Sequence, residues 1–283
     1  MSRRNNQDRV NTPVPDASPP PPAVEPQDST FSFVVPTEFV ELPSEGSFYP
    51  EGHALYGKTS IEIKHMTAKE EDILTSESLL RKGIAIERLL QSLIVDKSIK
   101  LDDLLVGDKN ALIVGARITG YGADYLTSVS CPSCRVAQEV EFDLSDLENR
   151  KCIPPEGVER TAEDTFFVPL PHSGVTVELR LLTGHEERQY LSASSRKRKK
   201  KLRESSSTDL LRLLILSVDG YESVESINNL LEVLPVKDSV YIREVYEQIS
   251  PDVNLNQEFE CQSCGYEGST GVPLSADFFW PGR

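Results

Sequence analysis

The chain has 283 residues, a formal net charge of −15 and a pI of about 4.8. This length suffices for one large domain or two smaller ones with their own hydrophobic cores. The acidic balance disfavours nucleic acid and anionic membrane as partners, unless positive charge is concentrated locally. The first residues lack the apolar stretch of a signal peptide, and the most apolar segment, residues 210–218, is too short to span a bilayer. We therefore expect no membrane partner and a reducing cytoplasm as the place of synthesis.

The N-terminal region divides into two predicted segments. Residues 1–30 are polar and proline-rich, which predicts a disordered tail, because such a composition buries too little apolar surface to fold. Residues 31–58 are predicted to form an extended docking arm, in which three prolines prevent a helix: Pro36, Pro43 and Pro50. Four apolar side chains are candidate anchors of this arm: Phe39, Leu42, Phe48 and Tyr49. They are expected to pack on a partner or on the chain's own domain.

The remainder of the chain shows an internal repeat. We expect a first repeat over residues 59–150, a linker over residues 151–164, and a second repeat over residues 165–283. Each repeat begins with an alternating strand that leads into a Thr-x-x-Glu capping box, formed by Thr67 and Glu70 or by Thr183 and Glu186.

Helical patterns then follow in the same order in both repeats. An amphipathic helix, a short apolar segment and a further helix are expected at matching positions: residues 87–94 and 209–216, residues 101–105 and 227–231, and residues 109–119 and 237–249. Each repeat ends in two short strands that flank a Cys-x-x-Cys pair. The predicted fold class is therefore α+β, with two tandem related α/β repeats.

The two cysteine pairs predict one structural zinc site. The predicted ligands are Cys131, Cys134, Cys261 and Cys264. Zinc in a structural site takes four ligands in a closed tetrahedron, and two Cys-x-x-Cys turns can supply them. The wide gap between the pairs follows from the duplication, so that one zinc-ribbon-like site would join the two repeats.

A redox-active pair is the weaker alternative. Reactive Cys-x-x-Cys motifs open a helix, whose dipole lowers the thiol pKa, whereas both pairs here precede strand-like sequence. The remaining cysteine, Cys152, lies in the linker and has no predicted role.

A basic run interrupts the second repeat of this acidic chain. Seven cationic side chains could contact an anionic partner: Arg196, Lys197, Arg198, Lys199, Lys200, Lys201 and Arg203. The run could bind phosphates through charge, dock on an acidic protein, or remain a loop without a partner. Without interleaved aromatic residues it is weak support for nucleic-acid binding.

Enzymatic motifs are missing from the sequence. The four histidines lack the spacing of a metalloprotease, and no phosphate-binding loop, dinucleotide fingerprint or nucleophile elbow occurs. A closed four-cysteine shell would leave no coordination position for a substrate. We therefore expect a non-enzymatic protein without a small-molecule substrate.

Several segments together resemble the T4-type bacteriophage baseplate hub protein family. The segments are residues 42–50 (LPSEGSFYP), 66–74 (MTAKEEDIL), 107–122 (GDKNALIVGARITGYG), 131–134 (CPSC) and 278–281 (FFWP). The resemblance covers most of the chain from about residue 36. It implies a role in the virion or tail assembly of contractile-tailed phages, with synthesis in the cytoplasm of the host bacterium and other baseplate or tail proteins as partners.

The leading hypothesis is thus a structural or assembly protein of a tail baseplate hub. Binding to partners is predicted to use Leu42, Phe48 and Tyr49 of the arm. It would also use a C-terminal aromatic cluster, Phe278, Phe279 and Trp280, for which core packing is the other interpretation. The alternative function is a zinc-ribbon nucleic-acid binder that uses the run from Arg196 to Arg203.

Overall fold

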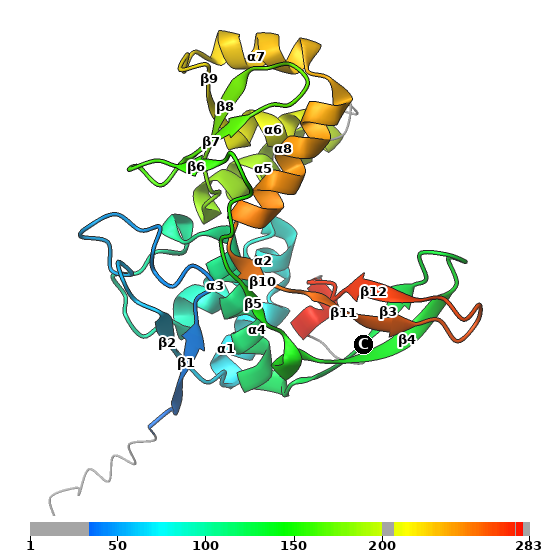
Figure 1. The fold of residues 1–283 in the computed structure, drawn as a ribbon. Helices are drawn as coiled ribbons and strands as arrows, with labels where there is room; N and C mark the ends of the chain where they lie inside the picture. Colours follow the sequence, from blue (N-terminus) through cyan, green and yellow to red (C-terminus); the bar gives the residue numbers. More distant parts are fainter. Residues whose placement is uncertain (1–33, 200–206, 275, 280–283) are drawn as a thin grey trace, which may run out of the picture. The chain divides into compact units, whose positions relative to one another are not determined.

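A computed structural model describes residues 34–199, 207–274 and 276–279 (Figure 1). It mixes helices with small sheets whose named strand pairs are all antiparallel, which confirms the predicted α+β class. The predicted tail over residues 1–30 lies outside the described residues. Within the described part, no helix combines the length and the apolar character that crossing a bilayer requires.

The N-terminal half, residues 34–150, contains the following elements in chain order: β1 (Thr37–Glu41), β2 (Ser60–Lys64), α1 (Ala68–Thr75), α2 (Glu77–Lys82), α3 (Ala85–Leu93), η2 (Leu101–Asp103), α4 (Val106–Tyr121), β3 (Asp124–Ser130), β4 (Ala137–Asp143), η3 (Leu144–Asp146) and β5 (Asn149–Arg150).

The C-terminal half, residues 151–279, contains β6 (Glu159–Arg160), β7 (Phe166–Pro169), β8 (Thr176–Leu179), α5 (Gly184–Lys199), α6 (Ser207–Leu214), β9 (Ile215–Val218), α7 (Val224–Val233), α8 (Val236–Ile249), β10 (Asp252–Val253), β11 (Asn256–Glu260), β12 (Glu267–Gly271) and η4 (Ala276–Phe279). Strand β10 pairs with β5 and so connects the two halves.

The segment predicted as an extended arm folds back on its own chain. Strand β1 pairs antiparallel with β2, and the Leu42 N–H continues the ladder by donating to the Thr59 carbonyl oxygen at 2.8 Å. The side chains of Leu42 and Tyr49 are 2% and 3% exposed. These two anchors therefore belong to the chain's own core. For them, the arm packs on its own domain, which is one of the two predicted arrangements.

The C-terminal half begins with a closely similar unit. Strand β7 pairs with β8 in the same way, and the Leu170 N–H continues that ladder to the Val175 carbonyl oxygen at 2.8 Å. The two strand-and-turn sequences are FVELPSEG over residues 39–46 and FVPLPHSG over residues 167–174. Their last glycines, Gly46 and Gly174, have φ values of 70° and 71°, a conformation that favours glycine.

A buried aspartate in the first turn of a helix holds each of these turns. Asp108 of α4 accepts hydrogen bonds from the Ser44 N–H (3.0 Å), the Ser44 hydroxyl (2.6 Å) and the Tyr49 hydroxyl (2.6 Å). Asp238 of α8 accepts from the backbone N–H groups of residues 172 and 173 at 3.0 and 2.8 Å. Both carboxylates are completely buried. Burial raises the pKa of Asp108, and the hydrogen bonds from Ser44 and Tyr49 act in the opposite direction.

Both predicted capping boxes form. The Thr67 N–H donates to the Glu70 carboxylate at 3.2 Å and starts α1. The Thr183 N–H donates to the Glu186 carboxylate at 2.9 Å and starts α5. These reciprocal contacts satisfy N–H groups that a helix leaves free at its first turn.

Arg117 joins the C-terminal segment to α4. Its side chain is completely buried and donates to the Phe278 carbonyl oxygen at 2.9 Å, and also to the carbonyl oxygens of Gly122 and Asp124. The side chains of Phe278 and Phe279 are 1% and 0% exposed. They therefore pack in the core, which was the alternative to partner binding for this aromatic cluster. Trp280 lies outside the described residues.

We expect Asp108→Ala to destabilise the fold by about 3 kcal/mol or more, because it leaves the Ser44 and Tyr49 donors buried without an acceptor. Urea unfolding of the purified chain measures this change. The exposed Asp103, five residues earlier, provides the control, since Asp103→Ala should change stability by no more than about 0.5 kcal/mol. Equal effects of the two substitutions would contradict the assigned role of Asp108.

Candidate metal centre

Two hairpins carry the four predicted cysteine ligands. Strands β3 and β4 flank Cys131 and Cys134, while β11 and β12 flank Cys261 and Cys264. The hairpins lie side by side in Figure 1. Both pairs therefore sit in turns between strands, and neither opens a helix.

The two turns have the same backbone geometry. The Cys131 N–H donates to the Val136 carbonyl oxygen, and the Cys261 N–H donates to the Tyr266 carbonyl oxygen, at 2.9 and 2.8 Å. The residue after the second cysteine has positive φ in both turns, 61° at Arg135 and 68° at Gly265. Each turn is thereby a tight knuckle that presents two thiols in one direction.

The four sulfur atoms lie at the corners of a small cage. The distance from Cys131 Sγ to Cys264 Sγ is 3.8 Å, the distance from Cys134 Sγ to Cys261 Sγ is 3.7 Å, and all four sulfurs lie within 4.8 Å of one another. In a tetrahedral site with metal–sulfur bonds of about 2.3 Å, sulfurs are separated by about 3.8 Å. Disulfide sulfurs would be about 2 Å apart. The cage therefore fits a metal ion held by four thiolates.

The protonation of the cage differs between two of its thiols. Burial acts to raise the pKa of Cys131, but the N–H groups of Cys134 and Ser133, with the neighbouring thiols, lower it to about 7. The Val136 N–H acts to lower the pKa of Cys134, yet burial and the thiols of Cys264, Cys131 and Cys261 raise it to about 12. A bound cation would favour the thiolate form of both cysteines, because metal binding releases thiol protons.

Polar contacts also hold the hairpins together beside the cage. The Gln138 side chain donates to the Glu260 carbonyl oxygen at 2.9 Å and accepts from the Gln262 N–H at 3.1 Å. Farther along the strands, the Gln257 side chain donates to the Asp143 carbonyl oxygen at 2.7 Å. Within the described part of the chain, the four cysteines are the one group of this size with metal-ligand geometry.

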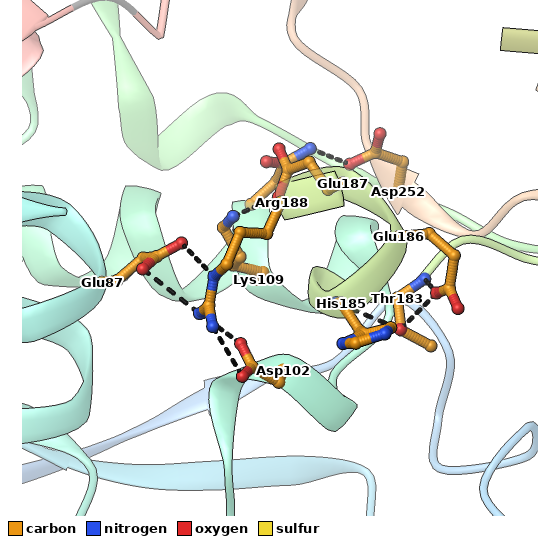
Figure 2. A network of polar contacts seen from close by, with 10 residues as sticks. Glu87, Asp102, Lys109, Thr183, His185, Glu186, Glu187, Arg188 and Asp252 are labelled. Atoms are coloured by element: carbon orange, nitrogen blue, oxygen red, sulfur yellow. Dashed lines mark hydrogen bonds and ion pairs between the residues drawn. The ribbon is translucent and has the colours of Figure 1, made fainter. Parts of the chain in front are cut away.

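A second polar junction joins the start of α5 to the N-terminal half (Figure 2). Arg188 lies between Glu87 and Asp102 and forms ion pairs with both, and Lys109 pairs with Glu187. Two backbone hydrogen bonds support this junction: from Val106 to Leu182 at 3.0 Å and from Gly184 to Leu104 at 2.8 Å. A Cβ at Gly184 would lie only 2.5 Å from the Leu101 carbonyl oxygen, so this close approach requires glycine.

The other predicted site residues are scattered. Phe48 is half-buried, and the guanidinium of Arg160 lies 4.1 Å from the centroid of its ring. Residues 196–199 of the basic run lie in the last turn of α5, whereas Lys200, Lys201 and Arg203 fall outside the described residues. The partner-binding role of these residues remains a prediction.

Sequence reasoning missed the two buried aspartates and the ion pairs of Arg188. A signal for the aspartates was present, since Leu-x-Val-x-Asp occurs at residues 104–108 and 234–238. An aspartate in a first helical turn usually faces solvent, where it interacts favourably with the helix dipole, so this signal became informative only once the contacts to the turns were visible.

We expect the purified chain to hold one tightly bound metal ion, and Cys134→Ala to abolish tight binding because three thiolates no longer close the tetrahedron. Elemental analysis after dialysis against a weak chelator measures the metal content. Affinity should also fall between pH 8 and pH 6, because protons compete for the thiolates.

Cys152→Ala is the matched control. It changes a cysteine that lies outside the cage and should leave the metal content unchanged. Two metal ions per chain, or retention of metal by Cys134→Ala, would contradict a single shared centre.

Comparison with known proteins identifies the family. The model of the family described as T4 bacteriophage base plate protein matches residues 36–280. No curated protein and no solved structure matches the chain. The matched region begins just before β1, ends just after η4 and includes all four cysteines. The chain therefore belongs to the T4 bacteriophage base plate protein family, as its sequence motifs predicted.

Proposed function

We propose that this protein is a structural or assembly component of the hub of a contractile-tail baseplate, and that it acts by binding other tail proteins rather than by catalysis. The observation that carries this proposal is the family match over residues 36–280. The family places the chain in the phage tail baseplate. The hub position and the binding mechanism are the parts that we add.

The bound metal is proposed to be zinc in a structural role. Four thiolates select zinc over the harder cations, and a closed tetrahedron leaves no open position for a substrate. Such a site can contribute roughly 10 kcal/mol or more to folding, which is comparable with the whole stability of a domain. The ligands of one hairpin lie 127–133 residues from their partners in the other, so the ion would join distant parts of the chain.

Internal duplication is proposed to explain why the ligands come from two distant hairpins. Four features support it: the matching strand pairs and turns, the buried aspartates Asp108 and Asp238, the capping boxes, and the knuckles. The repeat would begin at β1, earlier than the boundary at residue 59, because β1 and β7 occupy the same place in their units. The match between the two repeats also shifts by one residue at the end of the amphipathic helix (residues 87–94 and 209–216). Ile94 and Ile215 are equivalent there, because they lie opposite Ile63 and Leu179, which match in the two repeats.

Tail assembly provides the direct test of the proposed function. We expect purified tails from infected host cells to contain this chain in a fixed copy number, because a hub component occupies a defined set of positions. Quantitative mass spectrometry of tails and of hub intermediates measures the copy number. Absence of the chain from both tails and hub intermediates would overturn the proposal. Presence of the chain in intermediates alone would assign it a role in assembly.

The competing function uses the basic run from Arg196 to Arg203 to bind nucleic acid. Such binding should weaken steeply as salt increases, because each neutralised phosphate releases counterions. We expect no retention of the chain on DNA or RNA at about 0.15 M salt, given its net charge of −15. Retention that is lost when the seven cationic residues are replaced by glutamine would favour the nucleic-acid binder.

A further inference from the structure

Strand β1 has one edge paired with β2 and one edge directed away from it. Two backbone hydrogen bonds set which residues face β2: Leu42 to Thr59 and His65 to Pro36. Because backbone groups alternate along an antiparallel ladder, Thr37, Phe39 and Glu41 direct their N–H and C=O groups to the other edge. Among residues 34–199, 207–274 and 276–279, no strand pairs with this outer edge.

The corresponding edge in the C-terminal half is covered. Strand β6 pairs with the outer edge of β7, with Glu159 opposite Phe167. Phe167 corresponds to Phe39 in the two strand-and-turn sequences. The fold therefore contains its own example of a strand added at this position, and β1 presents the same backbone groups without one.

The turn that brings β6 onto β7 cannot be repeated at Pro36, the corresponding position before β1. That turn is closed by a hydrogen bond from the Thr161 N–H to the Thr165 carbonyl oxygen at 2.8 Å, and Asp164 within it has a φ of 62°. The residue at the corresponding position is Pro36, two residues before Glu38 as Asp164 is two before Phe166. Proline holds φ near −65°, so the same reversal of the chain is excluded there.

A groove of about 340 Å³ runs beside the outer edge of β1. Its apolar lining comes from β1, α4 and the segment after β4, and includes Val40, Val114, Ile118 and Leu147. The charged residues that line it are Glu38 and Glu41, both exposed and both acidic. The groove thus suits an extended segment that carries apolar side chains for this lining and basic side chains for the two carboxylates.

We propose that the outer edge of β1 and this groove bind an extended segment of a neighbouring tail protein, which pairs with β1 as an additional strand and presents basic side chains to Glu38 and Glu41. Edge-strand addition is an established mode of recognition, in which backbone hydrogen bonds provide affinity and alternate side chains provide specificity. The inference rests on the proposed function, because it names the surface through which the chain joins the baseplate.

The backbone N–H of Phe39 offers a selective test. Phe39→Pro removes this N–H from the outer edge and leaves the ladder with β2 intact, and proline is tolerated on edge strands. The matched control is Phe39→Thr, which removes the same exposed side chain but keeps the N–H. Tails are assembled in cells whose only source of the chain is the wild type or one variant, and the chain per tail is counted by mass spectrometry.

We expect Phe39→Pro to reduce incorporation at least tenfold and Phe39→Thr to change it less than threefold. Glu41→Lys, a second variant on an exposed side chain, should also reduce incorporation. Circular dichroism and metal content establish whether each purified variant is folded. If Phe39→Pro does not fold, the incorporation of Glu41→Lys into tails tests the inference instead, and incorporation at the wild-type level would contradict it. Incorporation of folded Phe39→Pro at the wild-type level would overturn this inference, whereas absence of the wild type from tails would overturn the proposed function instead.

Discussion

The rest of the structure depends on bringing four thiols from two distant hairpins into one cage. The sulfurs lie 3.7 and 3.8 Å apart across the hairpins, at the spacing that tetrahedral coordination requires. The same spacing connects the helices and strands behind one hairpin to those behind the other. Arg117 makes such a connection, because it ties the start of β3 to the C-terminal segment that follows β12.

The two halves contain the same strand-and-turn unit but differ in the contacts around it. In each half, a strand leads into a Leu-Pro-x-x-Gly turn whose backbone N–H groups donate to a buried aspartate, and in the N-terminal half the Tyr49 hydroxyl donates to that aspartate as well. The sheet of the C-terminal half has four strands, whereas β1 and β2 form a pair. One of the differences therefore lies at the outer edge of the first strand of each unit, which β6 covers at β7 and no described strand covers at β1.

A chain whose halves are joined at several places, and in which no described strand pairs with the outer edge of β1, suits a protein that acts by holding its partners in position. The ion pairs of Arg188 and Lys109, the β5–β10 pairing and the cysteine cage each connect the halves, so that movement of one half would break contacts in all three. Such a body can hold partners at a fixed separation within a baseplate. This interpretation requires no catalytic group, and a metal ion held by the cage would then contribute stability alone.

The sequence by itself determined the features that depend on neighbouring residues. The Cys-x-x-Cys spacing predicted the knuckles, the Thr-x-x-Glu spacing predicted both capping boxes, and the series of short motifs predicted the family. Only the tertiary structure decided the rest. Whether Leu42 and Tyr49 pack on a partner or on their own chain depends on what lies opposite, and an apolar side chain has the same pattern in both cases. The burial of Asp108 depends likewise on a turn 64 residues away, which no local spacing can reveal.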